Sequence, residues 1–247
     1  MSSDVRSLAL DALPWTEVAR HLERDTRLIL PVGTCDQHGP HLPIGAGTRL
    51  AEALARDLSE EFGVLRAPTL HYGVNLPTPR AMAGAATLRS KTLHRALNEL
   101  LAVWRTQGFQ EFIVISGEAH DPHVESVAAA SAEGARVRVV EPLTVNLSEF
   151  LDGPHGAQHG GEILTSLLLH LHPALVRMEA AEDFSLPAIG RRLARDGRLA
   201  ALPEGSPGLV GFPSRASAEK GERMYRHIRE KIRHKVFISP PAQPIDD

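Results

Sequence analysis

The stretch LILPVGTCDQHGPHLP, residues 28–43, decides how this chain is organised. Its apolar beginning, residues 28–32, predicts a buried strand that ends at Gly33. Asp36, His38 and His41 then follow within six positions, before a helical pattern at residues 48–62. Since α/β proteins place their chemistry in loops at the carboxyl ends of strands, we expect a functional site in this loop.

Apolar runs and helical spacing alternate along the rest of the chain. Strands are predicted over 27–33, 64–70, 112–115 and 137–140. Helices are predicted over 14–24, 48–62, 90–107, 123–132, 162–171 and 216–234, with an irregular region at 175–214. This alternation predicts an α/β fold with a parallel sheet and helices on both faces. No linker or repeat divides the chain, so we expect one domain over 1–247, with its core at about 15–235 and a tail at 236–247.

The composition excludes several classes of function. The chain has 247 residues and a net charge of −3, so no basic excess favours nucleic acid as a partner. No segment approaches the ~20 apolar residues that cross a bilayer, and the N-terminus lacks the pattern of a signal peptide. The single cysteine, Cys35, has no internal disulfide partner, which favours a reducing compartment. We therefore expect a cytoplasmic protein that binds neither membranes nor nucleic acid.

Two carboxylate–histidine pairs follow two of the predicted strands. Asp36-x-His38 comes after the first strand, and Glu118-x-His120 comes after the strand at 112–115. Loops after neighbouring parallel strands open at the same edge of a sheet, so both pairs face one cleft. Their nitrogen and oxygen donors suit Zn²⁺, Mn²⁺ or Fe²⁺. A lone Asp-x-His is more often a turn with a capping aspartate, but two such pairs favour a metal site.

A third polar cluster, His159-Gly-Gly-Glu162, stands at the start of the helix predicted at 162–171. His159 is a candidate for proton transfer or a further ligand, and Glu162 is a candidate general base. The alternatives are a simple loop histidine and a first-turn carboxylate favoured by the helix dipole. Cys35 matches no thiol motif and is interpreted as a small buried residue.

Four segments, in order, resemble the creatininase (creatinine amidohydrolase) family. LPVGTCDQHGPHLPIG at 30–45 is similar to that family's PxGSxEQHGPHLPLGTD. GF at 108–109, followed by a strand and SG at 116–117, is similar to its GF…NGH segment. HGG at 159–161 with TS at 165–166 resembles HAGxxETS. GLVGFP at 208–213 with ASAEKG at 216–221 resembles GVxGxPxxAT…KG, so the likeness covers about residues 15–235.

The resemblance implies a three-layer α/β/α sandwich with a mostly parallel sheet, assembled into a hexamer. It also implies a metal-dependent hydrolase that acts on C–N bonds of small molecules. Known activities of the family include creatinine ring opening, deformylation of a formylaminopyrimidine nucleotide and trimming of a modified peptide. The expected partner of this chain is therefore a small-molecule substrate.

The chain departs from the family at the metal site. Asp36 replaces a glutamate, Gly47 a bridging aspartate, Glu118 a histidine and His120 a glutamate. Because the new side chains at 36, 118 and 120 are themselves metal-binding types, we expect a remodelled site rather than a decayed one. Asp36, His38, Glu118 and His120 would hold one divalent ion, with zinc as the expected metal and manganese or iron as alternatives.

The expected substrate also differs from that of the family's best-known members, because the loop at 76–86 has changed. Arg49 and Arg80 stand near altered positions and are candidates to bind an anionic substrate group, with His41 as a third substrate-binding candidate. Each arginine could instead be a solvated surface residue.

Together these observations predict a metal-dependent hydrolase that cleaves an amide C–N bond in a small cyclic or linear amide carrying an anionic group. A metal-activated water would be the nucleophile. The alternatives are a non-catalytic member that binds a ligand through the same fold, and an enzyme that uses the ion for an isomerase or lyase step.

Overall fold

The central sheet is parallel throughout. The architecture comes from a computed structural model that describes residues 7–153, 158–186, 194–195 and 198–238. Four strands pair in the order β2-β1-β3-β4. They are β1 Arg27–Val32, β2 Leu65–Arg66, β3 Glu111–Ser116 and β4 Arg136–Val140. A separate antiparallel pair joins β5 (Ala194–Arg195) to β6 (Arg198–Leu199).

Six α-helices lie within the described residues. They are α1 Trp15–Leu22, α2 Ala46–Phe62, α3 Ser90–Thr106, α4 Asp121–Ala128, α5 Glu162–Leu171 and α6 Ala218–Ile232. Short 3-10 turns occur outside these helices: η1 Leu10–Ala12, η2 Pro142–Thr144, η3 Ser148–Phe150, η4 Pro173–Leu175, η5 Met178–Ala180 and η7 Pro213–Arg215. A π-helical segment, η8 Arg233–Ile238, directly continues α6. In the part of the chain that the structure covers, no helix is long and apolar enough to span a bilayer.

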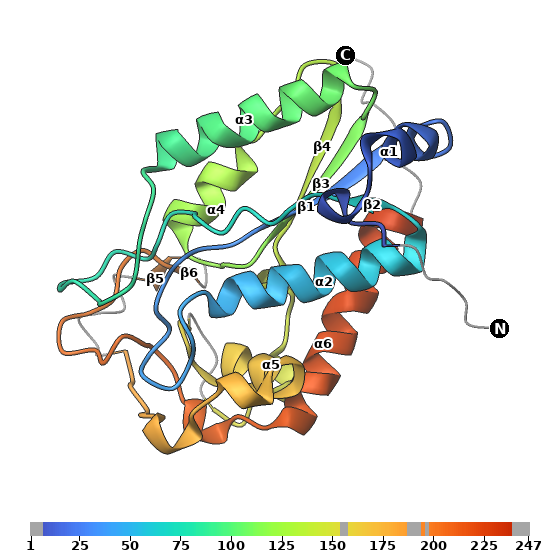
Figure 1. Ribbon diagram of the computed structural model, residues 1–247. Helices are drawn as coiled ribbons and strands as arrows, with labels where there is room; N and C mark the ends of the chain where they lie inside the picture. The colour runs from blue at the N-terminus through green and yellow to red at the C-terminus, as the bar shows by residue number, and fades with distance from the viewer. Residues whose placement is uncertain (1–6, 154–157, 187–193, 196–197, 239–247) are drawn as a thin grey trace, which may run out of the picture.

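The sheet separates two hydrophobic cores, because successive side chains of a strand point to opposite faces. On one face Ile29 and Ile113 pack with α2, α5 and α6. On the other, Leu28, Leu30 and Val114 pack with α3 and α4. Figure 1 shows α3 and α4 on one side of the strands and α2, α5 and α6 on the other. The three-layer α/β/α sandwich that the resemblance implies is confirmed.

Helix α2 follows the loop that carries Asp36 and His38, and a glycine stands at each of its ends. Gly45 precedes it with φ +81°, and Gly63 follows it with φ +64°. Both angles lie in the left-handed region that glycine adopts without strain. Between them Leu50, Leu54 and Leu58 are fully buried at a spacing of four, which is the apolar stripe of a core-facing helix.

Among the predicted boundaries that differ from the structure are those of β2 and of the C-terminal segment. The strand predicted at 64–70 is a two-residue ladder, followed by a single parallel bridge from Leu70 to Val32. Pro68 lies in the gap, and proline has no N–H to give to a ladder. Residues 236–238, predicted as the start of a tail, belong to η8, and Phe237 stacks on Phe62 with ring centroids 4.2 Å apart. Residues 239–247 lie outside the described residues.

Candidate metal centre

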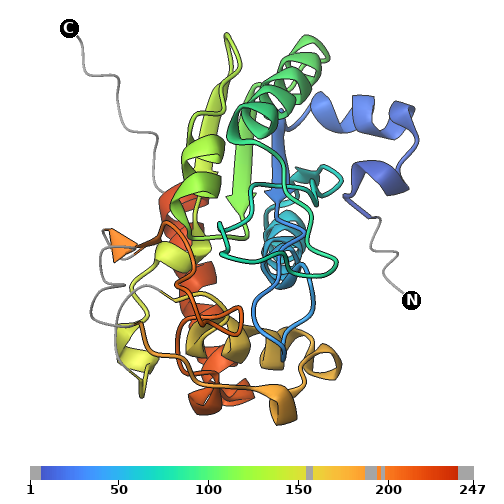
Figure 2. The same cartoon turned by 90° about the vertical axis from the view of Figure 1, so that its left-hand side faces the viewer.

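The ends of β1 and β3 bring the two predicted pairs together. These strands are neighbours in register, with Val32 opposite Ser116, so the loops that follow leave the same edge of the sheet. Figure 2 shows β1 and β3 running side by side in one direction toward the loops of the site. His38 follows β1, and Glu118 follows β3 by two residues. The predicted shared cleft is thus a consequence of parallel pairing.

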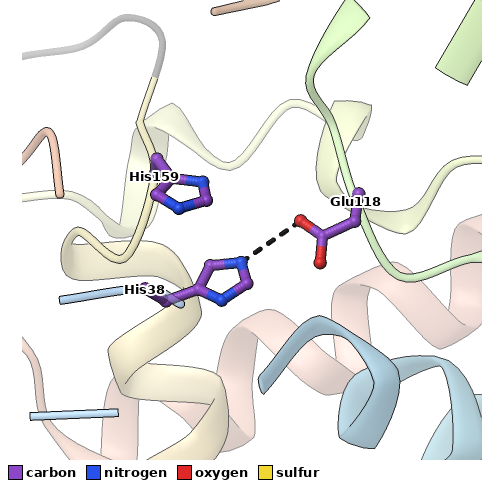
Figure 3. Close-up of side chains that lie close together, drawn as sticks. All are labelled: His38, Glu118 and His159. Atoms are coloured by element: carbon purple, nitrogen blue, oxygen red, sulfur yellow. Dashed lines mark hydrogen bonds and ion pairs between the residues drawn. The ribbon is translucent and has the colours of Figure 1, made fainter. Parts of the chain in front are cut away.

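Three buried side chains converge at this edge. The ligand atoms of His38, Glu118 and His159 all lie within 4.8 Å of one another. His38 Nε2 lies 3.2 Å from Glu118 Oε2, and the rings of His38 and His159 stack with centroids 4.2 Å apart. Figure 3 shows the two imidazoles facing the Glu118 carboxylate. Two nitrogen donors and one carboxylate form a ligand set that zinc accepts in catalytic sites, so the chemistry of these residues fits a divalent ion.

Glu118 is held in place from two sides. The Thr34 hydroxyl donates to Glu118 Oε1 at 2.5 Å, and Thr48 in α2 fixes the Thr34 backbone through its N–H and its carbonyl. A Cβ at Gly47 would overlap Glu118 Oε1 and the Gly117 carbonyl oxygen. The changes at 47 and 118 therefore belong together, because the carboxylate of residue 118 uses space that only a glycine at 47 leaves open.

Electrostatics keep Glu118 ionised despite its burial. Desolvation alone would raise its pKa, but His38, His120 and His159 together hold the pKa of Glu118 well below its usual range. The same carboxylate raises the pKa of the buried His38 against the desolvation that would lower it. An anionic carboxylate beside imidazoles attracts a divalent cation.

Asp36 lies beside this group with both oxygens already engaged. Oδ1 accepts the N–H of Gln37 at 2.8 Å, and Oδ2 accepts the N–H of Leu76 at 2.9 Å. Burial raises the pKa of Asp36 to about 6, with Glu118 adding to the rise and His38 opposing it. Asp36 is outside the tight group of three, and in this arrangement it fixes the loop around His38.

His159 has the hydrogen bond of a metal-binding histidine. Its Nε2 lies 2.7 Å from the Gln37 carbonyl oxygen, which can only accept, so Nε2 carries the proton and Nδ1 is left free. Histidine ligands usually donate their second N–H in this way. Gly160 makes the approach possible, since a Cβ there would overlap the His38 carbonyl oxygen.

Two further buried histidines lie near Glu118. His120 Nε2 lies 3.8 Å from Glu118 Oε2, and neither ring nitrogen has a hydrogen-bond partner among the described residues. Burial lowers the pKa of His120 to about 4, so the ring is neutral near pH 7. His123, which the sequence analysis did not select, is fully buried edge-on to His120 with centroids 5.8 Å apart. The sequence offered one indication of His123: it follows the predicted pair closely, in the pattern Glu118-x-His120-x-x-His123.

Glu162 does not join the cluster. Its Oε1 accepts the Asp152 N–H at 3.0 Å and Lys220 Nζ at 2.5 Å, and its Oε2 accepts the Gly153 N–H at 2.9 Å. All of these donors belong to the loop before His159 and to the start of α6. In this structure Glu162 is an anchor for that loop rather than a base that faces the imidazoles.

The three predicted substrate-binding residues lie elsewhere. His41 is buried, with Nε2 2.8 Å from the Thr165 hydroxyl. Arg49 lines a separate depression beside Thr34 and pairs with Glu52 at 3.4 Å. Arg80 is exposed in the 76–86 loop. None of the three lines the pocket that contains the histidines.

That pocket has a different arginine. Its walls include His38, Glu118, His120 and His159, together with Arg198 from β6. Arg198 is the sole lysine or arginine among the described residues that line it. Arg198 was not predicted as a site residue, because it lies in the region interpreted as irregular and no motif surrounds it.

A parallel α/β sheet with buried histidines and a carboxylate at the carboxyl ends of its strands defines a class, the α/β proteins with a candidate metal centre at a sheet edge. Comparison with known proteins makes the class specific. The family described as "Creatininase: Creatinine amidohydrolase" matches residues 11–236. The chain belongs to the creatininase family and is an amidohydrolase.

Two relatives and several solved structures show the range of that likeness. The chain is 30% identical to a mycofactocin precursor peptide peptidase of Mycolicibacterium smegmatis, over 86% of this chain and 85% of the relative. It is 26% identical to a creatinine amidohydrolase of Pseudomonas putida, over 88% of this chain and 91% of that relative. A solved structure of a mutant creatininase (Type II) superposes with a TM-score of 0.77 at 23% identity. The match covers 92% of this chain and 98% of the creatininase chain. Other solved creatininases of this fold are described as a Zn-Zn type and a Mn form.

Proposed function

We propose that this protein hydrolyses an amide C–N bond in a small molecule or a short peptide, with one divalent ion held by His38, Glu118 and His159. The observation that supports this most strongly is the convergence of three ligand atoms within 4.8 Å in a buried group. Zinc is the expected ion, since two imidazoles and a carboxylate with an open position are a common catalytic zinc set. Asp36 and His120 are the nearest candidates for a further ligand.

The residues of the chain have separate roles in this proposal. The ion, when bound, polarises an amide carbonyl and lowers the pKa of water. The Gln37 carbonyl and Thr34 hydroxyl orient His159 and Glu118. His120 lies neutral in the same pocket and has no hydrogen-bond partner in the part of the chain that the structure describes, so it is the candidate that accepts a proton and passes it to the leaving nitrogen. This role was predicted for His159 and Glu162, whose hydrogen bonds favour a ligand and an anchor instead.

Zinc titration followed by calorimetry tests the proposed ligands. Wild-type protein freed of metal is expected to bind about one zinc per chain. His38→Ala and Glu118→Gln are each expected to weaken zinc binding at least about tenfold, because each removes a proposed ligand. His71→Ala removes an exposed histidine outside the pocket and serves as the matched control. Stoichiometric zinc binding that is indifferent to both site variants would refute the assignment.

Turnover tests the reaction itself. The metal-loaded protein is assayed on creatinine, on N-formyl amino acids and on unblocked short peptides, then again after a chelator and after zinc is restored. Amide hydrolysis that is lost and regained with the metal is expected. A protein that binds zinc but cleaves none of these amides would favour the isomerase or lyase alternative.

The hexamer is also part of the proposal. Trp15, Tyr72 and Val103 are large side chains left exposed on a single chain, and an assembly would cover some of this apolar surface. Sedimentation equilibrium distinguishes a hexamer from a monomer directly.

A further inference from the structure

Arg198 brings a positive charge to a pocket that otherwise holds histidines and one carboxylate. It starts β6, directly after the part of the chain that carries β5, and its side chain is about one-third exposed. The other polar walls come from His38, Glu118 and the loop around His159. A substrate bound at the candidate metal centre therefore meets a guanidinium at the edge of the same pocket.

Glu141 fixes the position of this guanidinium. Arg198 Nη2 donates to Glu141 Oε2, and Glu141 directly follows β4. The contact joins the β5–β6 pair to the end of the sheet. A guanidinium has five N–H donors in a planar fork, and one donates to Glu141. The remaining donors suit the two oxygens of a carboxylate, which arginine binds in a bidentate way.

We propose that Arg198 is the specificity-determining residue of this site and that the substrate is an amide carrying a carboxylate, which Arg198 binds while the scissile amide lies at the His38–Glu118–His159 group. The inference rests on the proposed function, because it needs an ion at that group. The substrate still carries an anionic group, as the sequence predicts. Arg198 now replaces Arg49 and Arg80 as the residue that binds this group. Free carboxylates on short peptides and on acidic amides both satisfy this chemistry.

Two matched metal-binding probes test the proposal without knowledge of the substrate. Succinic monohydroxamate and butanohydroxamate share a hydroxamate that binds zinc and a chain of the same length, and they differ in a terminal carboxylate. Calorimetry on the zinc-loaded protein gives the ratio of their dissociation constants. We expect the carboxylate probe to bind at least about tenfold tighter to the wild type, as a charge-assisted bidentate contact provides.

Variants then locate the source of that ratio. In Arg198→Ala, the ratio is expected to fall close to one while the affinity for butanohydroxamate stays within about twofold of the wild type. In Arg198→Lys, a reduced preference for the carboxylate probe is expected to remain. Glu141→Gln keeps a side-chain oxygen that can accept the Arg198 N–H but removes the competing negative charge, so it is expected to raise the ratio, whereas a purely structural pair would leave the ratio unchanged. Arg95→Ala, which breaks an exposed pair with Glu99 on α3, is the control.

The outcomes separate the two proposals. If zinc and butanohydroxamate bind but the wild-type ratio is near one, or if the ratio survives Arg198→Ala, the role of Arg198 is refuted and the metal function stands. If the wild type binds no zinc, the proposed function fails and this inference fails with it. A ratio above ten that disappears in Arg198→Ala and rises in Glu141→Gln supports both.

Discussion

At the scale of single residues, the pair Gly47 and Glu118 carries most of what is particular to this site. Glu118 reaches His38 because α2 offers no side chain at 47. The sequence predicted ligand types at 36, 38, 118 and 120, since these residues follow strands. It could not predict which of them converge, because that depends on which carboxylate oxygens already hold backbone N–H groups, as those of Asp36 do.

Replacing Gly47 by alanine tests this pair. Alanine is favoured over glycine inside a helix by about 1 kcal/mol. We nevertheless expect Gly47→Ala to lower the free energy of unfolding and to weaken zinc binding at least about tenfold, since the new methyl displaces the Glu118 carboxylate. Urea unfolding and zinc calorimetry measure the two effects. Gly205→Ala is the control for zinc affinity alone, because a Cβ there meets no atom within 4 Å although the φ of +81° strains an alanine and so lowers stability by itself. Equal zinc affinity in both variants would refute the coupling.

At the scale of elements, the predicted helices and strands largely match those observed, because periodicity and glycine stops are local signals. The role of Glu162 was harder to interpret. Its carboxylate binds the N–H groups of Asp152 and Gly153 and the ammonium of Lys220 in α6. A contact that spans 58 residues has no local signature, so the sequence favoured catalysis for a side chain that anchors a loop.

Removing the Lys220 ammonium tests the anchor. We expect Lys220→Met to cost about 1–3 kcal/mol in the free energy of unfolding, because Glu162 keeps its backbone donors but loses its buried counter-charge. Zinc affinity is expected to change less than in Gly47→Ala, since Glu162 is not a ligand. Lys231→Met, at an exposed position of the same helix, should cost little. A stability unchanged by Lys220→Met would contradict the anchoring role.

At the scale of the whole molecule, buried histidines make the metal-free protein sensitive to acid. Burial lowers the pKa values of His41 and His120 to about 4, and that of His159 well below its ordinary value. A group whose pKa is lower in the folded state stabilises the fold above its unfolded pKa, near 6.5, and this stabilisation is lost as the pH falls toward 4. The raised pKa values of Asp36 and His38 act in the opposite direction but involve fewer groups.

Urea unfolding of the metal-free protein at about pH 7.5 and about pH 5 measures this balance. The free energy of unfolding of the wild type is expected to fall at the lower pH. In His41→Gln, we expect this fall to be smaller than in the wild type. His41 is the suitable position because it contacts Thr165 rather than the three proposed ligands. A wild-type protein that is more stable at pH 5 would contradict the neutral, buried state of these histidines.

The fold of the whole chain was the most predictable feature, since the QHGPHLP core and three later segments reproduce a family pattern in order. The lining of the pocket was the least predictable feature, because Arg198 belongs to β6, a strand with no recognisable sequence motif. One divalent ion is expected among His38, Glu118 and His159. Anomalous diffraction from a zinc-soaked crystal at the zinc edge measures it most directly. One peak per chain at about 2.0–2.2 Å from these three side chains is the predicted result, and no peak, or a peak away from all three, would contradict the account.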